Sequence, residues 1–240
     1  MTDKFKKLDQ ISVEYDSEVD FDRYLIEFNF DVLKHHLCGD RILEMGCASG
    51  VMTRLLLTKV PRLDVVDGSQ MYIDQLTPEL GDRVRFVKAL FEDYQADAKY
   101  SDILLARALE HIDDPVALLK KMAGWLRRDA AAGIHIVVPN ADSLHRKLGV
   151  AMGMISSVTA LSERDHKYGH KRVYTRTLLE EHVRAAGLQV NYVTGIYLKP
   201  LSNAQMEKWP RELVDGFYKV GFEFPDACAE VYLKCGLVGN

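Results

Sequence analysis

The sequence predicts an α/β fold with a doubly wound, mainly parallel sheet of seven strands. Three observations predict it. Short runs rich in Val, Ile and Leu alternate with segments of helical period, as in a parallel sheet covered by helices on both faces. A turn of small residues stands between the first strand and the helix that follows it. The chain has 240 residues, 48% of them apolar, which is enough for one sizeable core.

The alternation is traced element by element along the chain. Seven short apolar runs are predicted strands: 41–45, 62–66, 84–87, 101–106, 134–138, 188–194 and 230–234. Five segments of helical period are predicted helices: 21–37, 51–58, 70–76, 115–126 and 177–186. Pro115 suits the first turn of its helix, and Gly187 follows the last turn of another. No convincing helix links the last two strands, so we expect one of them to run antiparallel.

We expect a single domain over residues 1–240, with four parts. Residues 1–37 form an N-terminal helical segment, although the first 20 show no clear period. Residues 38–140 form the core that carries the binding turn, and 141–176 form a cap over the site. Residues 177–240 complete the sheet and carry an irregular insertion at 199–228.

Composition narrows the classes of partner and compartment. The net charge of −4 predicts no strong attraction to nucleic acid or to anionic membranes. The four cysteines form no Cys-x-x-Cys pair, so we expect neither a disulfide framework nor a structural zinc site. The polar N-terminus lacks the pattern of a signal peptide or membrane anchor, and a cytoplasmic location is expected. The sequence leaves open whether the chain forms a homodimer.

The strongest motif is the segment RILEMGCASG, residues 41–50. A strand delivers Glu44, and small residues then let the backbone turn tightly and approach a ligand at the carboxyl edge of the sheet. Asp67 ends the next strand about 20 residues later, where a carboxylate can bind ribose hydroxyls. A dinucleotide-binding turn would require glycine at the positions of Ala48 and Val51, which argues against a nicotinamide enzyme.

The turn, the acid that ends the second strand and the segment LEHIDDP after the fourth strand occur in an order that resembles class I S-adenosylmethionine-dependent methyltransferases, over about residues 40–140. The resemblance implies a Rossmann-like methyltransferase fold and S-adenosylmethionine as cofactor. The residues it implies for cofactor binding are Glu44, Gly46, Cys47, Ala48, Gly50, Asp67, Gly68, Leu90, Phe91 and Arg107.

Two positions depart from the family pattern. Ala48 replaces a usual glycine, so we expect a negative φ there or a small strain. Leu90 stands where the family often has an aspartate that binds the adenine. These departures motivate one alternative, a chain that has lost activity and serves as a binding partner.

Two histidines are candidates for the general base. The resemblance directs His111 toward the substrate, and His166 lies in the unusual segment SERDHKYGHKRVYT. A metal site would use Asp165, His166 and His170, but their spacing matches no known ligand signature, so no metal is expected. The same segment has a structural interpretation, in which Thr175 caps the following helix and the loop is merely ordered.

The acceptor is expected to be a small organic molecule. Contacts with it are assigned to Tyr15, Tyr24, Met152, Tyr168 and His170. Tyr24 also belongs to a helical stripe that can simply pack in the core. Likeness to small-molecule and sugar enzymes favours O-methylation, with N-methylation open, in secondary-metabolite or sugar biosynthesis. A nucleic-acid methyltransferase is a further alternative, but the Asn/Asp-Pro-Pro-Tyr/Phe motif common among base-directed enzymes is missing after the fourth strand.

Overall fold

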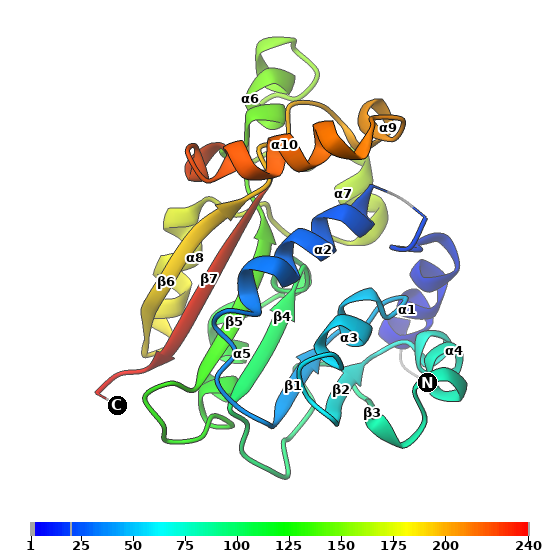
Figure 1. Ribbon diagram of the computed structural model, residues 1–240, viewed down its shortest axis with the longest axis vertical. Coiled ribbons are helices and arrows are strands. Elements are labelled where there is room, and N and C mark those ends of the chain that lie inside the picture. The colour runs from blue at the N-terminus through cyan, green and yellow to red at the C-terminus, as the bar shows by residue number, and fades with distance from the viewer. Residues whose placement is uncertain (1–2, 20, 240) are drawn as a thin grey trace.

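The computed structural model describes residues 3–19 and 21–239, and these form one seven-stranded sheet in the order β3-β2-β1-β4-β5-β7-β6 (Figure 1). Its strands are β1 (Ile42–Met45), β2 (Leu63–Asp67), β3 (Val84–Lys88), β4 (Asp102–Ala106), β5 (Gly133–Pro139), β6 (Leu188–Ile196) and β7 (Glu230–Leu237). All seven predicted strands are confirmed, with ends that move by a few residues.

The first five strands are parallel, and β7 is antiparallel to both of its neighbours. The expected antiparallel strand is therefore confirmed. Because β7 runs backwards, its first residue, Glu230, pairs with Pro139 at the end of β5 and with Ile196 at the end of β6. The start of β7 thus lies at the same edge as the carboxyl ends of the parallel strands.

Helices cover both faces of the sheet, and strand residues alternate between two cores. One face carries α2 (Asp22–Leu33), α3 (Val51–Leu56) and α4 (Gln70–Leu80), packed on residues such as Ile42 and Val65. The opposite face carries α5 (Pro115–Ala123) and α8 (Arg176–Ala185), packed on Leu43 and Val66. Figure 1 shows α2 and α3 in front of the sheet and α8 behind it.

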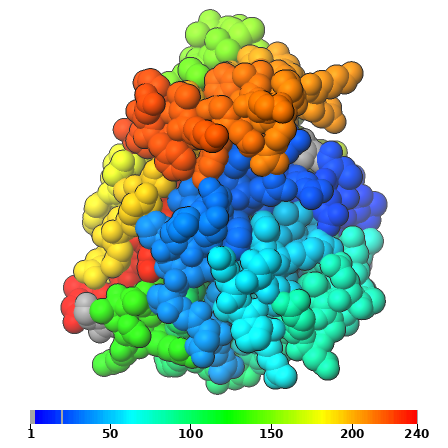
Figure 2. Space-filling view, viewed as in Figure 1, coloured from blue at the N-terminus to red at the C-terminus, as the bar shows by residue number. Residues whose placement is uncertain are grey.

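The segment 199–228 is not irregular, because it holds α9 (Asn203–Met206) and α10 (Arg211–Gly221). α10 lies against α2: the rings of Phe28 and Tyr218 stack at 4.1 Å, and the Tyr218 hydroxyl donates to Asp31 at 2.7 Å. Figure 2 shows this orange segment directly above the blue surface of α2. The packing partner is remote in sequence, which is why the local pattern alone did not predict a helix here.

The remaining helices surround the carboxyl edge. α1 (Asp3–Glu14) lies in the segment that showed no clear period, and it packs against α4 through the Ser69 hydroxyl, which donates to Asp9. α6 (Leu144–Ala151) and α7 (Glu163–Tyr168) form the segment expected to cap the site. None of the helices in the described part of the chain is long and apolar enough to cross a membrane.

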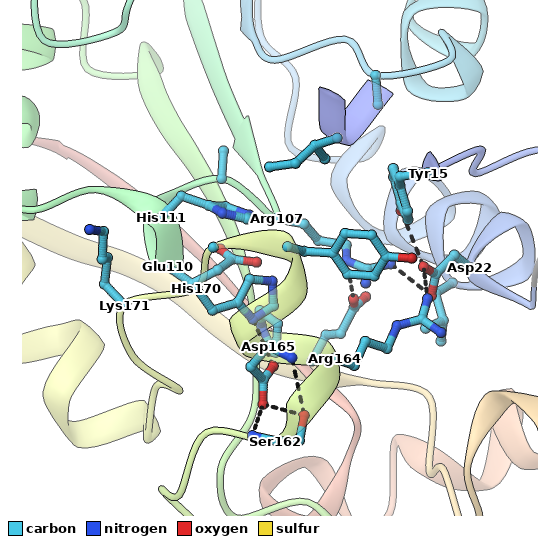
Figure 3. A pocket seen from close by; sticks show the side chains of 18 of the residues that line it. Tyr15, Asp22, Arg107, Glu110, His111, Ser162, Arg164, Asp165, His170 and Lys171 are labelled. Atoms are coloured by element: carbon cyan, nitrogen blue, oxygen red, sulfur yellow. Dashed lines mark hydrogen bonds and ion pairs between the residues drawn. The ribbon is translucent and has the colours of Figure 1, made fainter. Parts of the chain in front are cut away.

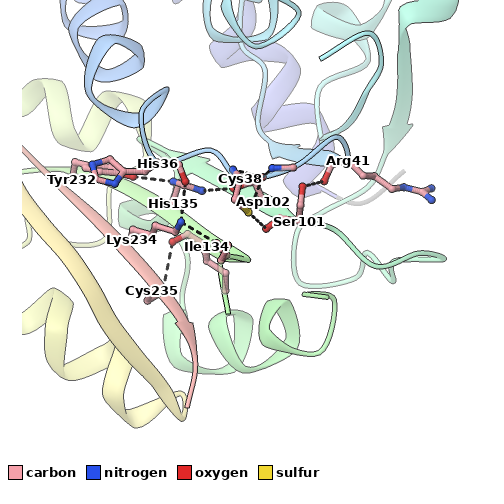
Figure 4. Close-up of polar contacts among 12 residues, drawn as sticks. His36, Cys38, Arg41, Ser101, Asp102, Ile134, His135, Tyr232, Lys234 and Cys235 are labelled. Carbon is pink, nitrogen blue, oxygen red and sulfur yellow. Dashed lines mark hydrogen bonds and ion pairs between the residues drawn. The ribbon is translucent and has the colours of Figure 1, made fainter. Parts of the chain in front are cut away.

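A buried polar network joins the adjacent strands β4, β5 and β7 away from the binding turn (Figure 4). His135 on β5 lies 2.9 Å from Asp102 on β4 and 2.9 Å from the Tyr232 hydroxyl on β7. The Asp102 carboxylate can only accept, so Nε2 donates to it, and Nδ1 of the neutral ring then accepts from the Tyr232 hydroxyl. Burial lowers the pKa of His135, in keeping with a neutral ring. All three side chains are fully buried, so this network belongs to the core.

Candidate functional site

A cavity of about 770 Å³ opens at the carboxyl edge of the sheet. Its walls come from α1, from the ends of β1 to β4, from α6 and α7, and from the segment that follows β6. The volume lies within the range of small-molecule sites. The position is the one expected for the ligand of a doubly wound sheet, beside the point where strand order reverses between β1 and β4.

The turn after β1 is held in a left-handed backbone conformation. The φ angles are +93° at Gly46, +45° at Ala48 and +86° at Gly50. The sequence predicts either a negative φ or a small strain at Ala48. Its φ is positive, so the backbone is strained there. A Cβ added to Gly50 would lie 2.5 Å from Leu76 on α4, so glycine is required for close packing as well as for conformation. Gly46 and Ala48 line the cavity, whereas Gly50 begins α3 outside its lining.

Asp67 lies at the end of β2, almost fully buried, and lines the cavity. Its carboxylate accepts from the backbone N–H of Cys47 at 2.9 Å and of Ser69 at 2.7 Å. Burial raises its pKa, and these two hydrogen bonds oppose the rise. The thiol of Cys47 also points to Asp67, at 3.4 Å, and Cys47 lies outside the cavity lining. Cys47 therefore orients the carboxylate through the protein.

The loops after β2 and β3 form the wall beneath α1. Gly68, Leu90 and Phe91 line the cavity, as the resemblance implied. A Cβ at Gly68 would lie 2.4 Å from the side chain of Leu8, so α1 covers this wall closely. The backbone approach at Gly46 and Gly68 and the inward face of Asp67 fit a nucleoside cofactor.

Glu44 does not reach the cavity. It is buried under the turn, where its carboxyl accepts from the Thr53 hydroxyl on α3 at 2.7 Å. Burial raises the pKa of Glu44 to about 8, and the Thr53 hydrogen bond opposes the rise. The cofactor contact that the resemblance implied for Glu44 is therefore wrong, because its carboxyl is bonded to α3 and lies outside the cavity lining.

Arg107 follows β4 with a positive φ of 53° and turns its side chain into the cavity wall. Its guanidinium lies 3.0 Å from Asp22 on α2 and 3.3 Å from Glu230 at the start of β7. Asp22 also contacts Arg164 at 3.1 Å and accepts from the Tyr15 hydroxyl at 3.1 Å (Figure 3). This charged wall unites four elements that are distant in sequence, so no local motif indicated Asp22 or Glu230.

A second cluster lies beside Arg107 and consists of Glu110, His111 and His170 (Figure 3). Glu110 is 1% exposed, and neither of its carboxylate oxygens has a hydrogen-bond partner within the described residues. Burial raises its pKa to about 7. The rings of His111 and His170 meet edge to face at 4.6 Å, and burial lowers the pKa of His111 to about 3. All three side chains line the cavity.

His170 is oriented by Asp165. Its Nδ1 lies 2.8 Å from Asp165 Oδ1, which leaves Nε2 as the free ring nitrogen. Asp165 is itself fixed, because its Oδ2 accepts from the backbone N–H and hydroxyl of Ser162 in a capping box at the start of α7. Burial alone would raise the pKa of Asp165, but the contacts with His170 and Ser162 hold it well below its usual range.

The loop that carries His170 is bonded to the segment after β4. The backbone N–H of Lys171 donates to the Glu110 carbonyl at 2.8 Å, and Arg172 donates to the Asp113 carbonyl at 3.1 Å. Thr175 caps α8, since its hydroxyl accepts from the backbone N–H of Leu178. The structural interpretation of this segment is therefore confirmed at Thr175, while His170 faces the cavity.

Of the predicted catalytic and acceptor-contact residues, two lie outside the cavity lining. His166 is exposed on α7 and does not belong to the cavity lining, so the prediction that it is a candidate base is wrong. His166 lies one helical turn before His170, and the left-handed Gly169 ends the helix and redirects the chain between them. Tyr24 packs edge to face on Phe21 and under Arg211, outside the lining, as its helical stripe allowed.

The other predicted acceptor contacts do line the cavity. The rings of Tyr15 and Tyr168 meet edge to face at 5.3 Å and link the chain after α1 to α7. Met152 lies at the rim and is 64% exposed. Lys199, which follows β6, also lines the cavity and was not predicted. No motif in the sequence indicated it.

The cluster also has the spacing of a metal site. One ligand atom each from Glu110, His111 and His170 lies within 4.8 Å of the others. This set shares only His170 with the three residues considered from the sequence. Nitrogen and carboxylate ligands of this kind suit a divalent transition metal.

Comparisons with known proteins agree with this architecture. A family model described as a methyltransferase domain matches residues 14–193. A ubiquinone biosynthesis O-methyltransferase from Aeromonas salmonicida is 25% identical over 174 residues, which cover 70% of each chain. A second protein of that description, from Marinobacter nauticus, is 22% identical over 69% of this chain and 71% of its own length.

Two solved structures illustrate the shared fold. One is a Thermotoga maritima S-adenosylmethionine-dependent methyltransferase, described as a possible histamine N-methyltransferase. It aligns with 97% of this chain and 98% of its own, with a TM-score of 0.67 and 14% identity. The other is the 1,6-didemethyltoxoflavin-N1-methyltransferase of Burkholderia thailandensis, with bound 1,6-didemethyltoxoflavin and S-adenosylhomocysteine. It covers 89% of this chain and 78% of its own, with a TM-score of 0.60 and 19% identity.

Proposed function

The chain belongs to the class I S-adenosylmethionine-dependent methyltransferases, and on that premise we propose that it methylates an oxygen of a small organic acceptor, with His170 as the general base. The observation that carries the proposal is the His170–Asp165 pair at the cavity wall, 2.8 Å apart. The curated relatives named as O-methyltransferases support oxygen as the acceptor atom.

The bound cofactor supplies an electrophilic methyl group, so the protein must orient an acceptor and remove its proton. Gly46, Asp67, Gly68, Leu90 and Phe91 would hold the cofactor on the β1–β3 side of the cavity. Tyr15, Tyr168 and Met152 would contact the acceptor on the other side.

His170 is the histidine best suited to accept the proton. Asp165 fixes its ring and stabilises the imidazolium that forms, which is the role of the carboxylate in catalytic His–Asp pairs. His111 is a poor acceptor, because burial lowers its pKa to about 3. Glu110 lies beside both rings, with a pKa of about 7, and can take up the proton from His170 in turn.

The test compares two histidines that lie one helical turn apart. His170→Asn should lower kcat about a hundredfold or more, as expected for a lost general base, while S-adenosylmethionine affinity is kept. His166→Asn is the matched control and should leave both unchanged. Transfer of labelled methyl to small phenols, catechols and hydroxy acids gives kcat, and calorimetry gives cofactor affinity. Equal turnover in the two variants would remove His170 from the chemistry.

A bound divalent cation is the second candidate for this cluster, because Glu110, His111 and His170 offer three ligand atoms at suitable spacing. A cation would occupy the ring nitrogen that the proposed base uses. We therefore expect methyl transfer to persist after dialysis against EDTA. Loss of turnover that returns with Mn²⁺ or Zn²⁺ would replace the base with a metal site.

A further inference from the structure

Lys199 is a buried cation that faces the cavity. It follows β6, it is 9% exposed, and it lines the cavity beside Glu230 and Asn203. Its ammonium donates to the amide oxygen of Asn203, a neutral group. No carboxylate of the described residues lies within ion-pair distance of it, and burial lowers its pKa to about 8. A buried ammonium without an ion-pair partner is costly unless a ligand compensates it.

The charged wall around Lys199 does not supply the missing anion. Its two carboxylates, Asp22 and Glu230, are already in contact with arginines, since Arg107 touches both and Arg164 touches Asp22. The amide of Asn203 donates to Asp22, so it fixes Asn203 between that carboxylate and Lys199. Among the described residues, both carboxylates of this wall therefore contact arginines, and neither forms an ion pair with Lys199.

His145 on α6 adds a second polar group to the same wall. It lines the cavity, and its buried Nδ1 has no hydrogen-bond partner in the described chain. Lys199 is close enough to contribute to the lowered pKa of His145, about 3, for which burial is the main cause. A neutral imidazole offers one N–H donor, so an oxyanion between the two side chains could bind both.

The topology separates this wall from the cofactor. The groups that fit a nucleoside lie after β1, β2 and β3, on one side of the switch point between β1 and β4. Lys199 follows β6, Glu230 begins β7 and His145 follows β5, all on the other side. An anion bound at Lys199 therefore belongs to the acceptor and is distinct from the carboxylate of the cofactor.

We propose that the methyl acceptor carries a carboxylate, which Lys199 and His145 bind on the β5–β7 side of the cavity. The proposal rests on the small-molecule methyl transfer proposed above and names its substrate class. Two apolar residues at the rim, Leu148 on α6 and Met152 directly after it, suit an uncharged body attached to that carboxylate.

The test uses two probes of similar shape, one with a carboxylate and one with a neutral amide. The full chain is loaded with S-adenosylhomocysteine, and benzoate or benzamide is titrated by calorimetry. We expect the wild type to bind benzoate about tenfold or more tightly than benzamide, the usual range for a hydrogen bond to a charged group. Lys199→Met should remove this preference. The control Lys208→Met changes an exposed lysine of the same segment, outside the cavity, and should keep it.

The outcomes distinguish failure of the carboxylate site from failure of the proposed function. Wild-type protein that shows no preference for benzoate contradicts the carboxylate site, and this measurement needs no variant to fold. If Lys199→Met keeps its melting temperature but loses S-adenosylhomocysteine affinity, Lys199 serves the cofactor and the proposal fails. If the protein methylates neutral acceptors but no carboxylate-bearing ones, the carboxylate proposal is contradicted and the proposed function is not. Absence of methyl transfer to every acceptor, with the benzoate preference kept, would contradict the proposed function instead.

Discussion

Two buried glutamates differ in their relation to the cavity. Glu44 lies on β1 and Glu110 follows β4, the next strand in the sheet, and burial raises the pKa of each, to about 8 and about 7. Glu44 is bonded to Thr53 beneath the cofactor turn and does not line the cavity. Glu110 lines the cavity, and its oxygens have no hydrogen-bond partner among the described residues.

The difference extends to the surroundings of each residue. On the cofactor side, the polar groups are satisfied by nearby backbone, as Asp67 is by Cys47 and Ser69. On the acceptor side, Glu110 and His145 have buried polar atoms without a hydrogen-bond partner among the described residues, and the Lys199 ammonium is bonded there only to the neutral amide of Asn203. The hydrogen bonds on the cofactor side are those of a binding turn that is already formed. The polar atoms without a partner on the acceptor side are explained if they bind the substrate.

The largest expected effect concerns the residue that orients His170. Asp165→Asn should lower kcat about a hundredfold, because the amide can still cap α7 but no longer stabilises an imidazolium. Cofactor affinity should stay the same, and Asp165→Glu should restore part of kcat. Steady-state kinetics with the labelled methyl donor measures this, with Glu163→Gln on the same helix as the control. A fall in cofactor affinity equal to the fall in kcat would mean a merely structural role.

On the cofactor side, Asp67→Asn should weaken S-adenosylmethionine binding about tenfold to a hundredfold, since the amide replaces a charged acceptor of hydrogen bonds. Calorimetry measures the dissociation constant. Asp64→Asn provides the control, because Asp64 lies on the same strand but pairs with Arg85 outside the cavity. Unchanged affinity in Asp67→Asn would refute its contact with the ribose.

The two glutamates should also differ in how they link stability to pH. Glu44 ionises near pH 4.5 in the unfolded chain and near pH 8 in the folded one. The folded state therefore binds more protons between these values, and Glu44 lowers stability as the pH rises through that window. Glu44→Gln should remove this loss, on the order of a few kcal/mol at pH 8. For Glu110→Gln the window should end near pH 7.

Urea unfolding at pH 5 and pH 8 measures the difference. The free energy of unfolding of the wild type should fall toward pH 8 relative to Glu44→Gln, whose methyl transfer should persist. A variant with the same pH dependence as the wild type would show that Glu44 ionises normally. Glu110→Gln should additionally reduce kcat, because Glu110, unlike Glu44, lines the cavity.

The smallest effect on methyl transfer is expected at a residue far from both the cofactor side and the acceptor side of the cavity. Tyr232→Phe removes the donor to His135 Nδ1 in the central network, which should lower the free energy of unfolding by about 1 to 3 kcal/mol. Turnover and cofactor affinity should stay at wild-type values. Urea unfolding at pH 7 checks the first expectation and kinetics the second; a large loss of turnover would connect this network to the site.

The sequence by itself determined the features that depend on neighbours along the chain. The strand–turn–helix at 42–56, the acid at the end of β2 and the cap at Thr175 all follow from local backbone geometry and spacing, and each lies where it was predicted. The antiparallel end of the sheet was also indicated, because no helix was evident to make a parallel crossover. In contrast, α10 was not predicted, because its apolar face packs on α2, which is remote in the sequence.

Only the tertiary structure decided which side chains meet at the acceptor wall. Asp22, Arg107, Glu230 and Lys199 come from four elements, and nothing in their spacing indicates that they are neighbours. The choice between His166 and His170 depended on where α7 ends, because one left-handed residue directs one ring to solvent and the other to the cavity. Local conformation thus specifies a turn, whereas the direction of a side chain toward a distant partner follows from packing.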